Sequence, residues 1–153
     1  SLVAVGVGTG TNTFLMGYLA AGDRPLGSMV VAASVGVAAM LLSLYPVSQV
    51  FQIEEDVARG DHTFASRFGL AGIRRFFVTA YPIGLGIAGW ILSDVRPWAG
   101  VGLLLAGGTG GIVSFLTLRT LTGRSEEYGI VMRLKFGASM SFVLFLIACL
   151  SWV

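Results

Sequence analysis

Five long stretches without a charged residue set the limits on what this chain can fold into. They span residues 1–22, 25–53, 76–93, 97–118 and 136–153. A helix crosses a bilayer with about 20 apolar residues. Backbone groups in lipid must be hydrogen-bonded internally, and the short alternating segments of a β-barrel are absent from the sequence. The sequence therefore predicts an all-α, polytopic membrane bundle with five transmembrane helices, forming a single domain over residues 1–153.

The composition supports the membrane class. Hydrophobic residues make up 55% of the 153 residues and charged residues 12%, whereas soluble domains carry about 25% charged residues. The net charge of +2 is too small to indicate nucleic acid as a partner. Cys149 is the only cysteine, so an intramolecular disulfide is excluded. No basic residues precede the first apolar stretch, so we expect no cleavable signal peptide. Because the chain starts with Ser1 and not with Met, we expect either processing or a longer parent protein.

The basic residues between the stretches predict the orientation. The connections on one side contain Arg24 and Arg96, and those on the other side contain eight: Arg59, Arg67, Arg74, Arg75, Arg119, Arg124, Arg133 and Lys135. By the positive-inside rule the second side is cytoplasmic, in a bacterial-type inner membrane, with the chain start inside and the chain end outside. The three tryptophans fall near the predicted outer ends, where they would anchor the helices at the interface: Trp90, Trp98 and Trp152.

Small and weakly polar residues inside the stretches predict close helix contacts. Gly6/Gly10 and Gly107/Gly111 have the four-residue spacing of membrane helix interfaces, which explains the glycine-rich runs better than a phosphate loop does. Four polar residues lie near the middle of the first stretch, and we expect their side chains to form hydrogen bonds between helices: Thr9, Thr11, Asn12 and Thr13.

A polar segment at 49–70 is the most informative part of the chain. If the second helix continues into it, Tyr45, Gln49, Gln52 and Asp56 lie at spacings of 4, 3 and 4 and share one helical face. We expect this polar stripe to run from the apolar zone to the cytoplasmic surface, beside a kink at Pro46. Polar groups at membrane depth often line a cavity. A solvated loop next to the membrane is the competing interpretation.

The residue types in this segment suit a hard cation. Gln52, Glu55 and Asp56 offer oxygen ligands of the kind that Mg²⁺ takes together with phosphate oxygens, and Asp61 offers a further carboxylate. Arg59 would contact a phosphate directly. A Mg²⁺–diphosphate site at the end of an apolar bundle implies a substrate with a charged head and a lipid-like tail.

The rest of the segment has simpler explanations. His62 could act as a general base, but an exposed loop histidine is the more common case. Gly60 predicts a turn, and Asp61 would be the N-cap of a short helix that ends at Gly69. In that context the Arg59–Gly60–Asp61 tripeptide is not an adhesion motif.

The segment resembles the second aspartate-rich motif of the UbiA superfamily of intramembrane prenyltransferases. The resemblance implies a nine-helix fold whose last five helices correspond to this chain, so that the chain would be the C-terminal half of such an enzyme. The residues that carry the resemblance are Tyr45-Pro46, Gln49, Gln52, Glu54-Glu55-Asp56, Arg59-Gly60-Asp61, Thr63 and Phe68-Gly69.

The resemblance also implies a chemistry. Members of the family use Mg²⁺ to hold the diphosphate of a polyprenyl donor and promote its loss, and a hydrophobic, often aromatic, acceptor captures the allylic cation. Asp56 and Asp61 would be the catalytic acidic residues, with Gln52 and Glu55 as further metal ligands. Gln52 stands where many members have aspartate. The substrate-binding positions would be Tyr45, Gln49, Gln52 and Arg59.

The family's first aspartate-rich motif has no counterpart here. The other two aspartates, Asp23 and Asp94, are isolated and lie on the predicted outer side. The sequence therefore leaves catalysis open between two possibilities. Either a missing N-terminal half or a partner membrane chain completes the metal site, or the chain is a non-catalytic half-length subunit that scaffolds a larger membrane complex.

Overall fold

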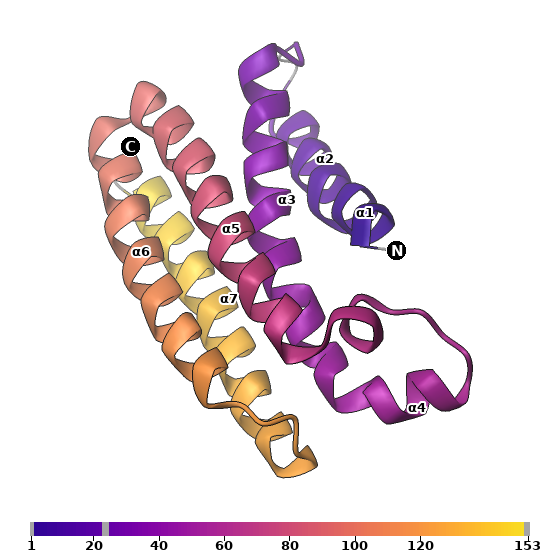
Figure 1. The fold of residues 1–153 in the computed structure, drawn as a ribbon. Helices are drawn as coiled ribbons and strands as arrows, with labels where there is room; N and C mark the ends of the chain where they lie inside the picture. Colours follow the sequence, from indigo (N-terminus) through magenta and orange to yellow (C-terminus); the bar gives the residue numbers. More distant parts are fainter. Residues whose placement is uncertain (1, 23–24, 152–153) are drawn as a thin grey trace.

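All regular elements in the described part of the chain are helical. The computed structural model describes residues 2–22 and 25–151 (Figure 1). Four helices are long and apolar enough to cross a membrane, which supports an integral membrane protein. They are α3 (Ser28–Gln49, continued by α4), α5 (Phe64–Val95), α6 (Pro97–Thr120) and α7 (Tyr128–Ser151). Asp23, Arg24 and Trp152, which entered the predictions of sidedness, lie outside the described residues.

The first apolar stretch forms a shorter helical run that packs on α3. It consists of α1 (Leu2–Val5), a π-helical segment (Gly6–Thr11) and α2 (Asn12–Ala20). A Cβ added to Gly10 would lie 2.9 Å from the Cα of Ala38, so the glycine spacing predicted for this stretch does mark a close helix contact. The side chains of Thr9, Asn12 and Thr13 are exposed, and among the described residues they make none of the expected hydrogen bonds between helices.

Two of the long helices, α5 and α7, begin before the apolar stretches that predicted them. The third stretch was expected to begin at residue 76, but α5 begins at Phe64, and α7 begins at Tyr128 rather than at 136. The difference is physical, because charge-free length measures only the part of a helix that lipid can hold. Polar residues such as Arg75 and Arg133 continue a helix beyond that part without breaking it.

The most extensive contact between long helices is the crossing of α3 and α5, which lie side by side in Figure 1. A Cβ on Gly84 would lie 2.5 Å from the carbonyl oxygen of Gly36 and 2.8 Å from the backbone N of Met40. Both obstacles are main-chain atoms, so a side chain at Gly84 would force the helices apart. The spacing of glycines in the sequence does not reveal this pair, because Gly36 and Gly84 belong to different helices.

The contact between α5 and α6 uses the glycines that the sequence did single out. Gly107 faces Leu85 and Gly111 faces Tyr81 so closely that a Cβ on either glycine would overlap the facing side chain. The Tyr81 hydroxyl donates a hydrogen bond to the Gly107 carbonyl at 2.9 Å. The predicted close packing at Gly107/Gly111 is therefore confirmed.

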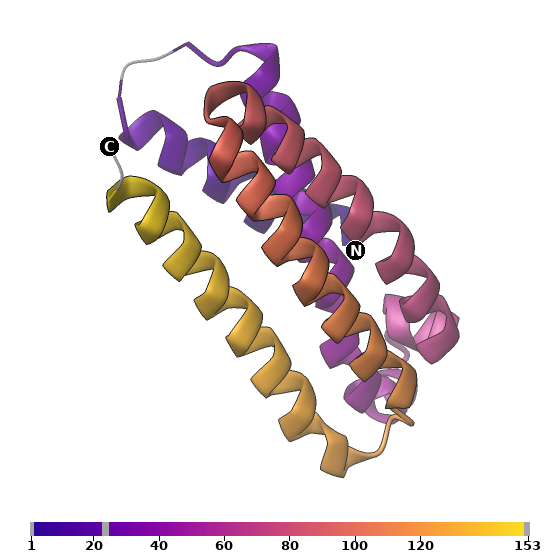
Figure 2. The ribbon, with the colours of Figure 1, turned by 90° about the vertical axis from the view of Figure 1, so that its left-hand side faces the viewer.

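The helix α7 runs alongside α6 and also touches α3 (Figure 2). Val131 is the only buried side chain among the α7 residues whose exposure is described. It joins the larger core cluster, which the ends of α3, α5 and α6 build around it: Val47, Val50, Ala65, Ile73, Phe77, Leu118 and Leu121.

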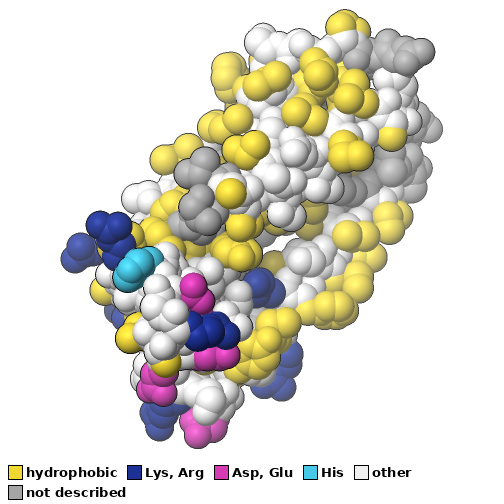
Figure 3. Space-filling model, turned by 90° about the vertical axis from the view of Figure 1, so that its right-hand side faces the viewer, with side chains coloured by type: hydrophobic (Ala, Val, Ile, Leu, Met, Phe, Trp, Pro, Cys, Tyr) yellow, Lys and Arg dark blue, Asp and Glu magenta, His cyan; other side chains and the backbone are white. Residues whose placement is uncertain are grey.

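The antiparallel order of the long helices gathers the charged residues at one end of the bundle (Figure 3). This arginine-rich end contains the end of α3, the start of α5, the end of α6 and the start of α7, and hence all eight basic residues that were predicted to be cytoplasmic. Arg96 lies at the opposite end and donates a hydrogen bond to the Cys149 carbonyl at 3.2 Å. The separation of charge is thus a property of the fold.

Arg74 fastens α5 to the end of α6. Its Nε donates to the Leu118 carbonyl at 2.9 Å, and its Nη2 donates to the carbonyls of Arg119 at 3.2 Å and Leu121 at 2.8 Å. The last carbonyls of a helix have no partner within the helix. Arg74 supplies that partner from the neighbouring helix, a role that the sequence analysis did not assign to it.

We expect Arg74→Gln to destabilise the bundle by about 2 kcal/mol, because hydrogen bonds to a charged group are worth about 1.5–3 kcal/mol. Thermal unfolding of the purified chain in a detergent without added phospholipid measures the change. Arg75→Gln is the matched control, since it removes the same charge one residue later from a side chain that makes no hydrogen bond within the described residues. Equal losses for the two variants would contradict the capping role of Arg74.

Candidate functional site

The candidate site is built where the second long helix changes direction. The helix α3 passes through Pro46 to Gln49 and then tightens into a 3₁₀ turn, Val50–Gln52, before α4 (Ile53–Ala58) leads away from its axis (Figure 1). Gln52 has φ −112° and ψ 2°, outside the helical range. Pro46 was expected to mark the kink. It removes one backbone bond without ending the helix, and the irregular geometry appears one turn later.

This irregular turn interrupts the predicted polar stripe. A 3₁₀ turn advances by about 120° per residue instead of 100°, so α4 no longer continues the face of α3. Tyr45 and Gln52 are exposed, Gln49 is partly buried, and Asp56 is buried with 4% of its surface exposed. Asp56 therefore belongs to a cluster separate from the other three.

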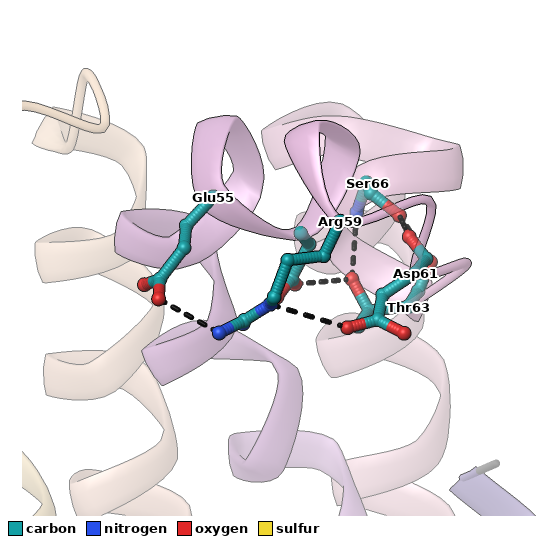
Figure 4. A network of polar contacts seen from close by, with 6 residues as sticks. Glu55, Arg59, Asp61, Thr63 and Ser66 are labelled. Carbon is teal, nitrogen blue, oxygen red and sulfur yellow. Dashed lines mark hydrogen bonds and ion pairs between the residues drawn. The ribbon is translucent and has the colours of Figure 1, made fainter.

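Arg59 is the centre of that cluster, and three carboxylates surround it (Figure 4). Its Nη1 is 2.7 Å from Glu55 Oε1, its Nη2 is 3.2 Å from Asp56 Oδ1, and its Nε is 3.4 Å from Asp61 Oδ2. The predicted residues Glu55, Asp56, Arg59 and Asp61 thus do come together. We call these four residues the Arg59 cluster.

Asp56 joins the end of α4 to the start of α5. Besides its ion pair, its Oδ2 accepts a hydrogen bond from the Thr63 hydroxyl at 2.9 Å, and its backbone carbonyl accepts one from the Asp61 N–H at 2.8 Å. A buried carboxylate needs such partners. Asp56 was predicted to be a metal ligand, and its hydrogen bond with Thr63 was not predicted.

Asp61 was predicted to be the N-cap of the short helix, but the structure places Thr63 there, and the helix begins at Phe64. The Thr63 hydroxyl accepts a hydrogen bond from the Ser66 N–H at 3.1 Å, which is the bond that an N-cap makes. Asp61 is instead drawn to Arg59. The turn at Gly60 is confirmed by a φ of +75°. Gly69, with φ +58°, separates the short helix from the rest of α5, as expected.

The Arg59 cluster is anionic overall, because three carboxylates face one guanidinium. The pKa of Arg59 is raised above its ordinary value. The main cause is the negative charge of Glu55, and the second is the hydrogen bond that Arg59 donates to Asp56. Arg59 therefore stays charged at every relevant pH. The excess negative charge would attract a further cation, while the exposed Arg59 side chain can turn toward an arriving phosphate.

The carboxylate oxygens of the Arg59 cluster are ligands that suit Mg²⁺, but their arrangement in this structure does not form a complete metal site. Glu55, Asp56 and Asp61 offer the oxygens that Mg²⁺ prefers. Across residues 2–22 and 25–151, however, no three His, Cys, Asp or Glu side chains are arranged so that they could hold a metal ion. Arg59 occupies the place between the carboxylates, and Gln52 is not part of the cluster. Substrate oxygens or ligands from another segment would be needed to complete the site.

Two further features of this part of the chain bear on the site. Gln49 Oε1, in α3 before the irregular turn, is buried and has no hydrogen-bond partner among the described residues, although such atoms are normally paired. An open hollow borders the Arg59 cluster at Asp61 and contains the exposed His62. The hollow is lined by Val57, Gly60, Asp61, His62, Ser66 and Arg67.

Taken together, the fold and the cluster define an all-α protein with four helices that can cross a membrane and a compact anionic polar site at its arginine-rich end. Comparisons with protein-family models, with curated proteins and with solved structures found no match to this chain.

Proposed function

We propose that this chain forms the second diphosphate-binding half of an intramembrane prenyltransferase, which transfers a polyprenyl group from its diphosphate to a hydrophobic, often aromatic, acceptor. The observation that carries the proposal is the Arg59 cluster, in which three carboxylates and a guanidinium converge at the end of an apolar bundle. In this proposal the five helical stretches are the last five of nine, the arginine-rich end is cytoplasmic, and the chain spans an inner membrane of the bacterial type.

The proposal gives each part of the site a task. When bound, Mg²⁺ would neutralise the diphosphate and make it a better leaving group. Glu55 and Asp56 would be its ligands in this chain, with Gln52 reaching it through water and Asp61 as a further carboxylate. Arg59 would release its carboxylates and pair with a phosphate oxygen.

Two residues of α3 would act deeper in the site. The unpaired Gln49 Oε1 and the exposed Tyr45 precede the cluster along the chain, within the apolar helix. They would meet the start of the prenyl tail and the lipophilic acceptor. A missing N-terminal half or a partner membrane chain would supply the other acidic ligands.

Binding of farnesyl diphosphate to the purified full chain, in detergent and together with any membrane chain that copurifies, tests this function. We expect binding with Mg²⁺ and its loss when EDTA removes the metal, because the carboxylates of the cluster repel a free diphosphate. Isothermal titration calorimetry measures both conditions. Equal binding with Mg²⁺ and with EDTA would contradict the proposal.

A non-catalytic scaffold subunit is the second candidate, and one observation favours it. The side chain of Arg59 already contacts all three carboxylates, and Asp56 accepts the hydrogen bond from Thr63 at the start of α5. These contacts form a structural joint between α4 and α5 with no added ligand. A scaffold would bind no farnesyl diphosphate under either condition and would be isolated in a fixed stoichiometry with other membrane chains.

A further inference from the structure

Several arginines at the arginine-rich end have no carboxylate partner. Every ion pair among the described residues involves Arg59. Arg75 and Arg119 are exposed, and neither guanidinium donates a hydrogen bond within the described residues. Two unpaired guanidinium groups beside a membrane-crossing region attract phosphate groups, which arginine binds through paired hydrogen bonds.

The structure places these two arginines at the same junction. Arg74, the neighbour of Arg75 in the chain, donates its Nη2–H to the backbone carbonyl of Arg119 at 3.2 Å. Arg74 donates three hydrogen bonds to the carbonyls at the end of α6, whereas the side chains of Arg75 and Arg119 are exposed. The Arg119 guanidinium also lies over the Phe115 ring, with Cζ 5.8 Å from the ring centroid, which limits its freedom.

Apolar residues continue from both arginines toward the middle of the bundle. Val78 follows Arg75 by one helical turn, and Leu116 and Ile112 precede Arg119 by one and two turns. These three side chains are exposed by 44%, 53% and 63%. A ligand that fits this arrangement carries a phosphate at one end and long apolar chains attached to it. A soluble anion lacks such chains.

We propose that Arg75 and Arg119 form a binding site for an anionic phospholipid of the surrounding membrane. The lipid phosphate lies between the two guanidinium groups at the junction of α5 and α6, and the acyl chains lie along Val78, Leu116 and Ile112. The site is separate from the Arg59 cluster and does not depend on the proposed transferase activity. The lipid phosphate supplies the negative charge that the two unpaired guanidinium groups lack within the described residues.

Native mass spectrometry of the full chain, with equal amounts of phosphatidylglycerol and phosphatidylcholine added to the detergent, tests the site. We expect one phosphatidylglycerol to be retained, with at least tenfold preference over phosphatidylcholine. The double variant Arg75→Gln/Arg119→Gln should lose that preference. Arg124→Gln/Arg133→Gln is the matched control, because it removes two charges from the same end of the molecule and should retain the lipid.

The remaining outcomes decide against the site. Equal retention of the two lipids by the unaltered chain would overturn it, and so would equal losses in both double variants, which would show only general attraction to positive charge. Displacement of the phosphatidylglycerol by millimolar inorganic phosphate would assign the arginines to a soluble anion instead. Circular dichroism of each variant establishes that its helices remain formed, and Arg75→Lys/Arg119→Lys, which keeps the charge, should retain part of the preference.

Discussion

Replacing Gly84 by valine is expected to break the contact between α3 and α5 and to cause a large loss of stability. The first side-chain atom would lie 2.5 Å from the Gly36 carbonyl oxygen and 2.8 Å from the Met40 backbone N. Main-chain atoms in a helix cannot yield as a flexible side chain does. Overpacking costs about 1–3 kcal/mol even where side chains adjust, so we expect a loss at or above the top of that range.

The same helix offers a matched control for this prediction. Gly86 has no atom within 4 Å of an added Cβ, so Gly86→Val makes the same chemical change on an open face. Thermal unfolding and size-exclusion chromatography in detergent compare the two variants. Gly84→Val should lower the unfolding temperature and produce aggregates, while Gly86→Val should behave as the unaltered chain. Similar profiles for both would show that the helices can separate at little cost.

Asp56→Asn should reduce Mg²⁺-dependent binding of farnesyl diphosphate by at least tenfold. The change removes the charge of the one buried carboxylate in the Arg59 cluster, and an amide is a poorer ligand for a hard cation. It also weakens the hydrogen bond from Thr63 and the ion pair with Arg59. Titration calorimetry with Mg²⁺ and with EDTA measures the effect on binding.

Two companion variants separate binding from structure. Glu54→Gln makes the same change of charge two residues away, at an exposed position outside the cluster, and should leave binding intact. Thr63→Val removes the hydrogen bond to Asp56 and the N-cap bond from Ser66 but leaves every carboxylate. It should therefore lower stability by about 1–3 kcal/mol while Mg²⁺-dependent binding persists. If Thr63→Val abolishes binding as completely as Asp56→Asn does, Asp56 acts through the local fold and not as a ligand.

The apolar lengths in the sequence predicted the membrane helices because that property is local. A run such as 97–118 needs no partner to be recognised, and α6 covers it almost residue for residue. Helix ends were less predictable, since the part of α5 that follows Gly69 already includes Arg74 and Arg75 before the apolar stretch begins at residue 76. The four-residue glycine spacing indicated contacts within a helix surface but could not pair Gly36 with Gly84.

The sequence predicted which residues form the candidate site, but it did not predict how their side chains are arranged. The spacing in the sequence grouped Asp56 with Gln52 and Gln49, because it assumed one continuous helix. The 3₁₀ turn at Val50–Gln52 and the Thr63 cap direct Asp56 toward Arg59 and Thr63 instead. Whether the carboxylates hold a metal depends on groups beyond this network, and that is why the proposed chemistry rests on a binding experiment.

The local character of the Arg59 cluster has a consequence for the order in which the protein acquires its structure. Its hydrogen bonds and ion pairs join residues no more than seven positions apart, whereas Arg74 must wait for a carbonyl 44 positions later in the chain. Contacts between near neighbours close small loops and form quickly. During synthesis this polar joint is therefore expected to form while α6 is still being made, so that the later helices assemble on a corner that has already taken its shape.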